Sequence, residues 1–98
     1  MSLFLYKLIP PRPTFVVDMS ETEKKVMQEH GVYWKGLVDK GIVIVVGPVL
    51  DPKGAWGLAI FEVDNEQAAK TLGTNDPAVK AGLSFEVYPM SPMTMLRK

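Results

Sequence analysis

One long helix with a marked beginning and end constrains most strongly how this chain can fold. Ser20-Glu21-Thr22-Glu23 matches a capping box, in which Ser20 caps the helix and the Glu23 side chain reaches back to the Ser20 backbone. The helical pattern then runs to about Lys40, and Gly41 ends it. Because the apolar positions form one stripe, this helix must pack against another surface.

Runs of β-branched and aromatic residues predict that this surface is a sheet. Asp51-Pro52-Lys53-Gly54 places proline at the second position of a turn between two such runs, which indicates a hairpin. A second helix is expected from Asp64 and Gln67 to about Gly73, and Asp76-Pro77 begins a further short helical turn. The predicted strands are Leu3–Ile9, Ile42–Leu50, Ala55–Val63 and Leu83–Met90.

The predicted elements follow the order β-α-β-β-α-β. This order is typical of an α+β fold of the ferredoxin-like type, a four-stranded antiparallel sheet with two helices on one face. The chain has 98 residues, enough for one core, so residues 1–98 are expected to form a single domain. The proline-rich segment Pro11–Met19 is expected to be a loop, with Phe15, Val16 and Val17 packed on the core.

The second face of such a sheet would be unusually apolar. The third strand is apolar on both sides, and so is the stretch 42–46 of the second strand. Two helices cover only one face, and the other would expose more apolar area than monomers usually tolerate. We therefore expect this face to pack on a second copy, in a homodimer of the dimeric α+β barrel type. The alternative is a monomer in which segment 11–19 and the methionine-containing tail cover the face.

The composition excludes several classes of function. Eleven basic and eleven acidic residues cancel, so nothing in the charge predicts binding to nucleic acid or to an anionic membrane. Cysteine is absent and histidine occurs once, which removes disulfides, thiolate metal sites and the usual zinc ligand sets. No glycine-rich phosphate loop or dinucleotide motif predicts a cofactor. Without a secretion signal or a membrane-spanning run, a cytoplasmic location is expected.

The single histidine, His30, lies inside the apolar stripe of the long helix. At about 100° per residue it shares one face with Val26, Tyr33, Trp34 and Leu37. An imidazole in this place is either a core residue with a satisfied hydrogen bond or the working group of a small site. Position alone favours the structural interpretation.

Other positions also have both a structural and a functional interpretation. Asp76 before Pro77 is a typical cap for a short helix, and the pattern alone favours that role. Arg12 is a candidate to receive an anionic ligand, although a solvated arginine is the commoner case. Gly31 and Gly36 each weaken a helix by about 1 kcal/mol relative to alanine, so close backbone packing is expected there.

Several short motifs together resemble the YCII-related (YciI-like) family. The resemblance spans about residues 27–89, and it is the order and spacing of the motifs that make it specific. Pro11–Met19 departs from the family, because it is longer and richer in proline than the usual link. The resemblance implies the fold of the dimeric α+β barrel proteins. The motifs are His30 followed by Tyr33, Gly47-Pro48, Gly57, Asp76-Pro77 and Ala81-Gly82-Leu83.

The resemblance also implies an active-site pair, since members of the family carry a histidine and an aspartate that here are His30 and Asp76. One branch of the family is associated with dehydrochlorination of chlorinated aromatic compounds. A carboxylate bonded to one imidazole nitrogen leaves the other free to exchange a proton near neutral pH. The substrate-binding residues expected around the pair are Arg12, Tyr33, Trp34, Gly47 and Pro48.

The sequence thus leads to one main hypothesis and two alternatives. The main hypothesis is a small cofactor-independent enzyme that performs elimination, isomerisation or hydrolysis on a small polar or aromatic molecule. The first alternative is a non-catalytic module that binds or senses such a molecule. The second is an interaction domain in which the pocket is vestigial.

Overall fold

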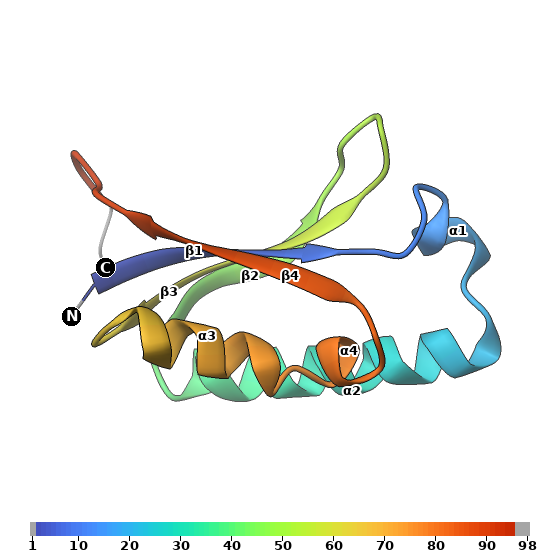
Figure 1. Ribbon diagram of the computed structural model, residues 1–98, viewed down its shortest axis with the longest axis horizontal. Coiled ribbons are helices and arrows are strands. Elements are labelled where there is room, and N and C mark those ends of the chain that lie inside the picture. Colours follow the sequence, from blue (N-terminus) through green and yellow to red (C-terminus); the bar gives the residue numbers. More distant parts are fainter. Residues whose placement is uncertain (1, 96–98) are drawn as a thin grey trace.

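The structure, a computed structural model that describes residues 2–95, is one antiparallel sheet with helices packed on one face (Figure 1). Residues 1 and 96–98 of the predicted single domain lie outside the described residues. The strand order is β2-β3-β1-β4, which confirms the predicted ferredoxin-like α+β fold. The strands are β1 (Ser2–Ile9), β2 (Val43–Val49), β3 (Trp56–Val63) and β4 (Ser84–Met90). The helices are α1 (Phe15–Asp18), α2 (Glu21–Asp39), α3 (Glu66–Thr74) and α4 (Pro77–Lys80).

The ends of the two longer helices follow from hydrogen bonds to their first backbone amides. The predicted capping box of α2 is present, with Ser20 Oγ accepting from Glu23 N at 3.1 Å and Ser20 N donating to Glu23 Oε1 at 2.8 Å. Helix α3 begins one residue later than predicted, because the side chain of Asn65, and not Asp64, accepts from Ala68 N at 2.9 Å.

The segment between β1 and α2 differs from the predicted loop. It contains the short helix α1, which turns the side chains of its three apolar residues in different directions. Only Phe15 is buried, whereas Val16 is 51% exposed and Val17 is 81% exposed. The expectation that all three pack on the core is therefore wrong for the two valines.

The core lies between the sheet and helices α2, α3 and α4, which cover the same face (Figure 1). Alternate residues of β1 point into it, namely Phe4, Tyr6 and Leu8. Trp34 of α2 packs on this layer, with its ring centroid 4.7 Å from that of Tyr6. The remaining buried members of the core are Leu37, Val43, Ala59, Phe61, Ala69 and Ala78.

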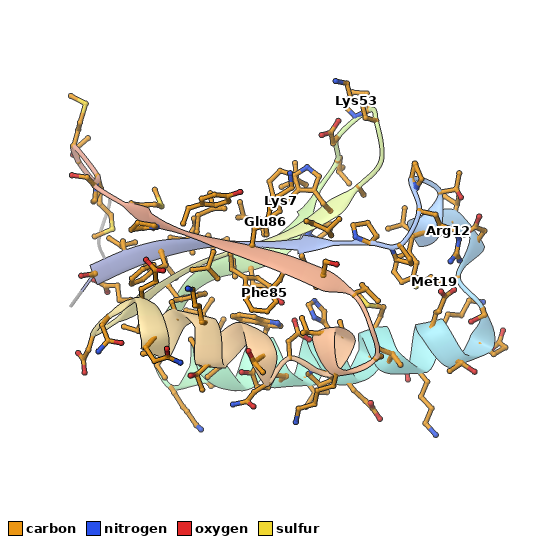
Figure 2. The ribbon with its side chains drawn as sticks, viewed as in Figure 1. Lys7, Arg12, Met19, Lys53, Phe85 and Glu86 are labelled. Carbon is orange, nitrogen blue, oxygen red and sulfur yellow. The ribbon has the colours of Figure 1, made fainter. Side chains whose placement is uncertain are left out.

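The opposite face of the sheet carries apolar side chains that no described helix covers. Lys7 and Glu86 lie on this face and Phe85 lies on the other (Figure 2). Val45 is 50% exposed and Tyr88 is 49% exposed. The β2–β3 hairpin rises on the side away from the helices (Figure 1). The predicted apolar second face is therefore present.

Two features at the helices bear on earlier expectations. A Cβ atom added at Gly31 or at Gly36 would meet nothing within 4 Å, so the expected close packing at these glycines is wrong. Close packing occurs in α3 instead, where a Cβ at Gly73 would overlap the ring of Phe85. Among residues 2–95 no helix is both long and apolar enough to cross a membrane.

Candidate active site

The site is built around Asp76, a carboxylate with no exposed surface. Asp76 caps α4, because its Oδ1 accepts from Ala78 N at 2.8 Å and Pro77 occupies the first helical turn. The predicted capping role is therefore confirmed. The cap also fixes the orientation of the carboxylate at the start of α4.

Three side chains from distant parts of the sequence donate to the same carboxylate. The phenol of Tyr6 in β1 donates to Oδ2 at 2.8 Å, and the indole of Trp34 in α2 donates to Oδ2 at 2.8 Å. His30 Nδ1 lies 2.9 Å from Oδ2 and 3.0 Å from Oδ1. With Ala78 N, the carboxylate has four donors, which is the kind of satisfaction that a buried charge requires.

These hydrogen bonds keep the Asp76 carboxyl group ionised in spite of its burial. Burial by itself would raise the pKa, but the hydrogen bonds from His30, Trp34 and Ala78 N and the charge of the His30 ring lower it below the ordinary value. Burial and the neighbouring Asp76 raise the pKa of Tyr6 far above that of a free phenol. Tyr6 therefore stays protonated and donates a hydrogen bond to Asp76 across the physiological range of pH.

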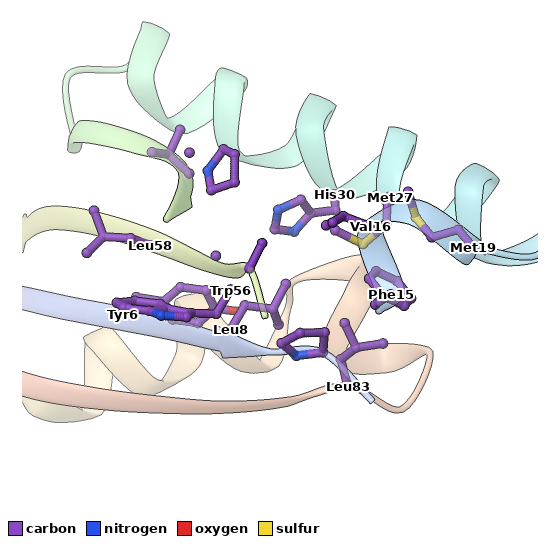
Figure 3. Close-up of a pocket in the computed structure, with 16 residues that line it drawn as sticks. Tyr6, Leu8, Phe15, Val16, Met19, Met27, His30, Trp56, Leu58 and Leu83 are labelled. Carbon is purple, nitrogen blue, oxygen red and sulfur yellow. The ribbon is translucent and has the colours of Figure 1, made fainter. Parts of the chain in front are cut away.

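His30 connects this carboxylate to a cavity. Its side chain is 15% exposed, and the ring projects from α2 toward the cavity (Figure 3). With Nδ1 committed to Asp76, Nε2 is the nitrogen left for a ligand, and within residues 2–95 no protein group bonds to it. A neutral ring in this arrangement carries its proton on Nδ1 and has a free electron pair on Nε2.

The cavity has a volume of about 260 Å³ and opens to solvent between the sheet, α2 and the segment around α1 (Figure 3). Gly47 and Pro48, two of the predicted substrate-binding residues, line it. Apart from His30, the phenol of Tyr6 and the thioethers of Met19 and Met27, the lining residues contribute hydrocarbon, aromatic or backbone surface. The other lining residues are Leu8, Pro10, Phe15, Val16, Met19, Met27, Val46, Ala55, Trp56, Gly57, Leu58 and Leu83.

The other predicted binding residues do not line this cavity. The indole of Trp34 donates to Asp76, and the hydroxyl of Tyr33 donates to the backbone oxygen of Leu72 at 2.6 Å. Both aromatic rings lie on the predicted helix face, but their polar atoms point toward α3 and α4 and not toward the cavity.

Arg12 is occupied by two carboxylates. Its guanidinium donates to Glu23 at 2.8 and 2.9 Å and to Asp18 at 2.8 Å. The hydrogen bond from Arg12 is the main reason that the pKa of Glu23 falls to about 2. The guanidinium thus holds the segment around α1 onto the start of α2, and four of its five N–H donors are engaged before any ligand arrives.

Tyr6 is the site residue that the sequence reasoning missed. The available signal was its position, because it lies on the core side of β1, where a buried phenol needs a hydrogen-bond partner. Among the described residues no group of three or more His, Asp, Glu or Cys side chains is arranged to hold a metal ion.

The sequence and the fold both resemble known proteins. The sequence profile of the YCII-related domain matches residues 4–94. The chain belongs to the YCII-related family. No curated protein matches it in sequence. Among solved structures it is similar to 5-chloro-2-hydroxyhydroquinone dehydrochlorinase (TftG) from Burkholderia phenoliruptrix AC1100, in complex with 2,5-dihydroxybenzoquinone. The TM-score is 0.67 and the identity 21%, over 93% of this chain and 94% of that one, so the likeness shows the fold.

Proposed function

We propose that this YCII-related protein is a small cofactor-independent enzyme in which His30 is the general acid and base. The observation that carries the proposal is the placement of the ring, with Nδ1 on a buried carboxylate and Nε2 at the wall of an open cavity. General acid–base assistance of this kind contributes roughly 10²- to 10⁴-fold to a rate.

In the proposed step, Nε2 takes a proton from the substrate while Nδ1 keeps its hydrogen bond to Asp76. The electron pair of the broken X–H bond then moves into the substrate, where it forms a new double bond and expels a leaving group or shifts an existing double bond. The resulting imidazolium is stabilised by the Asp76 charge, and it returns the proton to the leaving group, the product or water.

Asp76 has a positioning role in this proposal and does not take the proton itself. Its two oxygens already accept four hydrogen bonds, and it is not among the residues that line the cavity. A carboxylate so held selects the Nδ1–H form of the ring, which leaves Nε2 as the base.

The solved relative supports elimination as the first reaction to test. That protein is a dehydrochlorinase by name. Removal of a proton by Nε2 and loss of a leaving group, as described above, would accomplish an elimination of this kind here. Isomerisation uses the same base on the substrate, and hydrolysis would use it to take a proton from an attacking water, so the proposal covers all three reaction classes.

The first experiment reads the ring directly. Long-range ¹H–¹⁵N spectra of the neutral ring should show a proton on Nδ1 and a free electron pair on Nε2. The chain contains one histidine, so the signals need no assignment. A ring with its proton on Nε2 would contradict the proposal, because Nε2 would then have no electron pair with which to act as a base.

The second experiment measures turnover of a panel of small elimination and isomerisation substrates. His30→Gln keeps a polar side chain of similar length and should abolish any activity that the unmodified chain shows. Saturable binding and thermal stabilisation without product would instead indicate a non-catalytic ligand-binding module.

We also propose that the functional particle is a homodimer joined through the open face of the sheet. Val45, Tyr88 and Met90 leave this face apolar and exposed. On the same face, Lys7 Nζ lies over the Trp56 ring, 4.8 Å from the ring centroid. Lys7 is also directly opposite Glu86 in the sheet, so the face carries both signs of charge among its apolar groups. Such a face complements a second copy of itself.

A further inference from the structure

We infer that the natural ligand of the cavity is an uncharged, hydrocarbon-rich molecule with a single weakly acidic O–H, N–H or C–H group, which it donates to His30 Nε2. This inference rests on the proposed function and goes beyond it by naming the class of substrate. It follows from three properties of the cavity: its free hydrogen-bonding group, its lack of a free positive charge among the lining side chains, and its volume.

Among its lining side chains, the cavity offers one uncommitted polar group. The Tyr6 phenol donates to Asp76, and the Trp56 indole donates to Asp51 at 3.3 Å. This leaves Nε2 of His30 as the side-chain nitrogen or oxygen of the lining that is free to bond a ligand. Since Nε2 accepts a hydrogen bond in the neutral ring, the matching group of the ligand must be a donor.

A ligand with a negative charge would find no partner for that charge. The positive charge available at the wall is a protonated His30, and Asp76 already neutralises it at 2.9 Å. The guanidinium of Arg12 is bonded to both Glu23 and Asp18 and is not part of the lining. A carboxylate or phosphate would therefore bring an unpaired charge into an apolar space.

The size of the cavity sets the size of the hydrocarbon. An apolar cavity of about 150 Å³ is known to hold benzene. At about 260 Å³, this cavity has room for a molecule larger than one unsubstituted six-membered ring. The ring of Phe15 and the thioethers of Met19 and Met27 belong to residues that line it, which suits a flat, polarisable ligand.

The test compares three probes of one shape, namely 2-naphthol, 2-methylnaphthalene and 2-naphthoate. Binding is measured by calorimetric or NMR titration at neutral pH, together with the ¹⁵N shift of His30 Nε2. We expect 2-naphthol to bind best and to shift Nε2. The methyl analogue should bind about 3- to 10-fold more weakly, because it lacks one hydrogen bond. The carboxylate should bind at least ~30-fold more weakly.

Two variants of β2 form a matched pair that locates the probe. Val46 lines the cavity and Ile44, two residues away, does not. Val46→Phe should reduce the affinity for 2-naphthol at least tenfold by filling the space, whereas Ile44→Phe should leave it unchanged. Equal affinities in the two variants would place the probe outside the cavity and overturn the inference.

Binding of 2-naphthoate as tight as that of 2-naphthol would also overturn the inferred class. That result would leave the acid–base proposal standing as long as the ring keeps its proton on Nδ1. Conversely, a ring protonated on Nε2 would end the acid–base proposal and with it the need for a donor on the ligand, whereas the exclusion of 2-naphthoate by its charge would stand. The probe titration needs no turnover, so the two failures are distinguishable.

Discussion

Replacement of Asp76 by asparagine tests the site most directly, because it removes the charge and keeps the shape. An asparagine that retains its oxygen toward Ala78 N turns its NH₂ group toward Tyr6, Trp34 and His30. The phenol and the imidazole can reorient to accept from this NH₂ group, but the indole of Trp34 can only donate and loses its partner. Breaking a buried charged network of this kind costs about 3–5 kcal/mol.

The size of this loss should depend on pH, with a sign fixed by the lowered pKa of Asp76. A carboxyl group whose pKa is lower in the folded chain stabilises the fold at pH values above its unfolded pKa of about 3.9. That contribution is lost as the pH falls through the folded value. The Asp76→Asn variant lacks it at every pH, so its deficit should be full at pH 7 and should shrink below about pH 4.

Urea unfolding of both proteins at pH 7 and at several values below pH 4 measures this deficit. Asp39→Asn is the matched control, since Asp39 is a surface residue paired with Lys35 and its replacement should have no measurable effect. A deficit that is the same at pH 7 and at the lowest pH would refute the argument that Asp76 is a stabilising buried anion. So would an Asp76→Asn variant as stable as the original at pH 7.

Three further predictions follow from other contacts. Tyr6→Phe should lower the free energy of unfolding by about 1.5–3 kcal/mol in urea titrations, since it removes one hydrogen bond to a buried charge. Gly73→Ala should cost about 1–3 kcal/mol because its Cβ overlaps Phe85, whereas Gly36→Ala should gain up to about 1 kcal/mol, and reversed signs would contradict the packing. In sedimentation at micromolar concentration the chain should behave as twice 10.9 kDa and the Val45→Glu variant as 10.9 kDa, and a monomeric original would end the dimer proposal.

The fold was predictable because its main elements are marked by local chemistry. Ser20 and Glu23 cap one helix through contacts three residues apart, and such contacts are visible in a sequence. Helix α1 was missed because it has four residues and its cap, Thr14, makes no side-chain hydrogen bond to the backbone. What holds α1 is Arg12, whose partner Glu23 lies eleven residues away on the next helix. That contact depends on the packed chain and leaves no periodic signal.

The candidate site was less predictable because its members meet only through the fold. Asp76 lies 46 residues from His30 and 70 from Tyr6, and no spacing rule connects such positions. Helical periodicity placed Trp34 on the correct face of α2, but it could not show that the indole nitrogen faces Asp76 and not the cavity.

The two interpretations of Asp76 that the sequence left open are compatible in the structure. Oδ1 accepts from the backbone of α4, and Oδ2 accepts from the Tyr6 and Trp34 side chains beside the His30 ring. The cap gives the carboxylate a fixed orientation, and a fixed carboxylate is what an acid–base imidazole needs in order to present one nitrogen consistently. The helical turn after Asp76 therefore contributes to the chemistry proposed for His30, although none of its backbone lines the cavity.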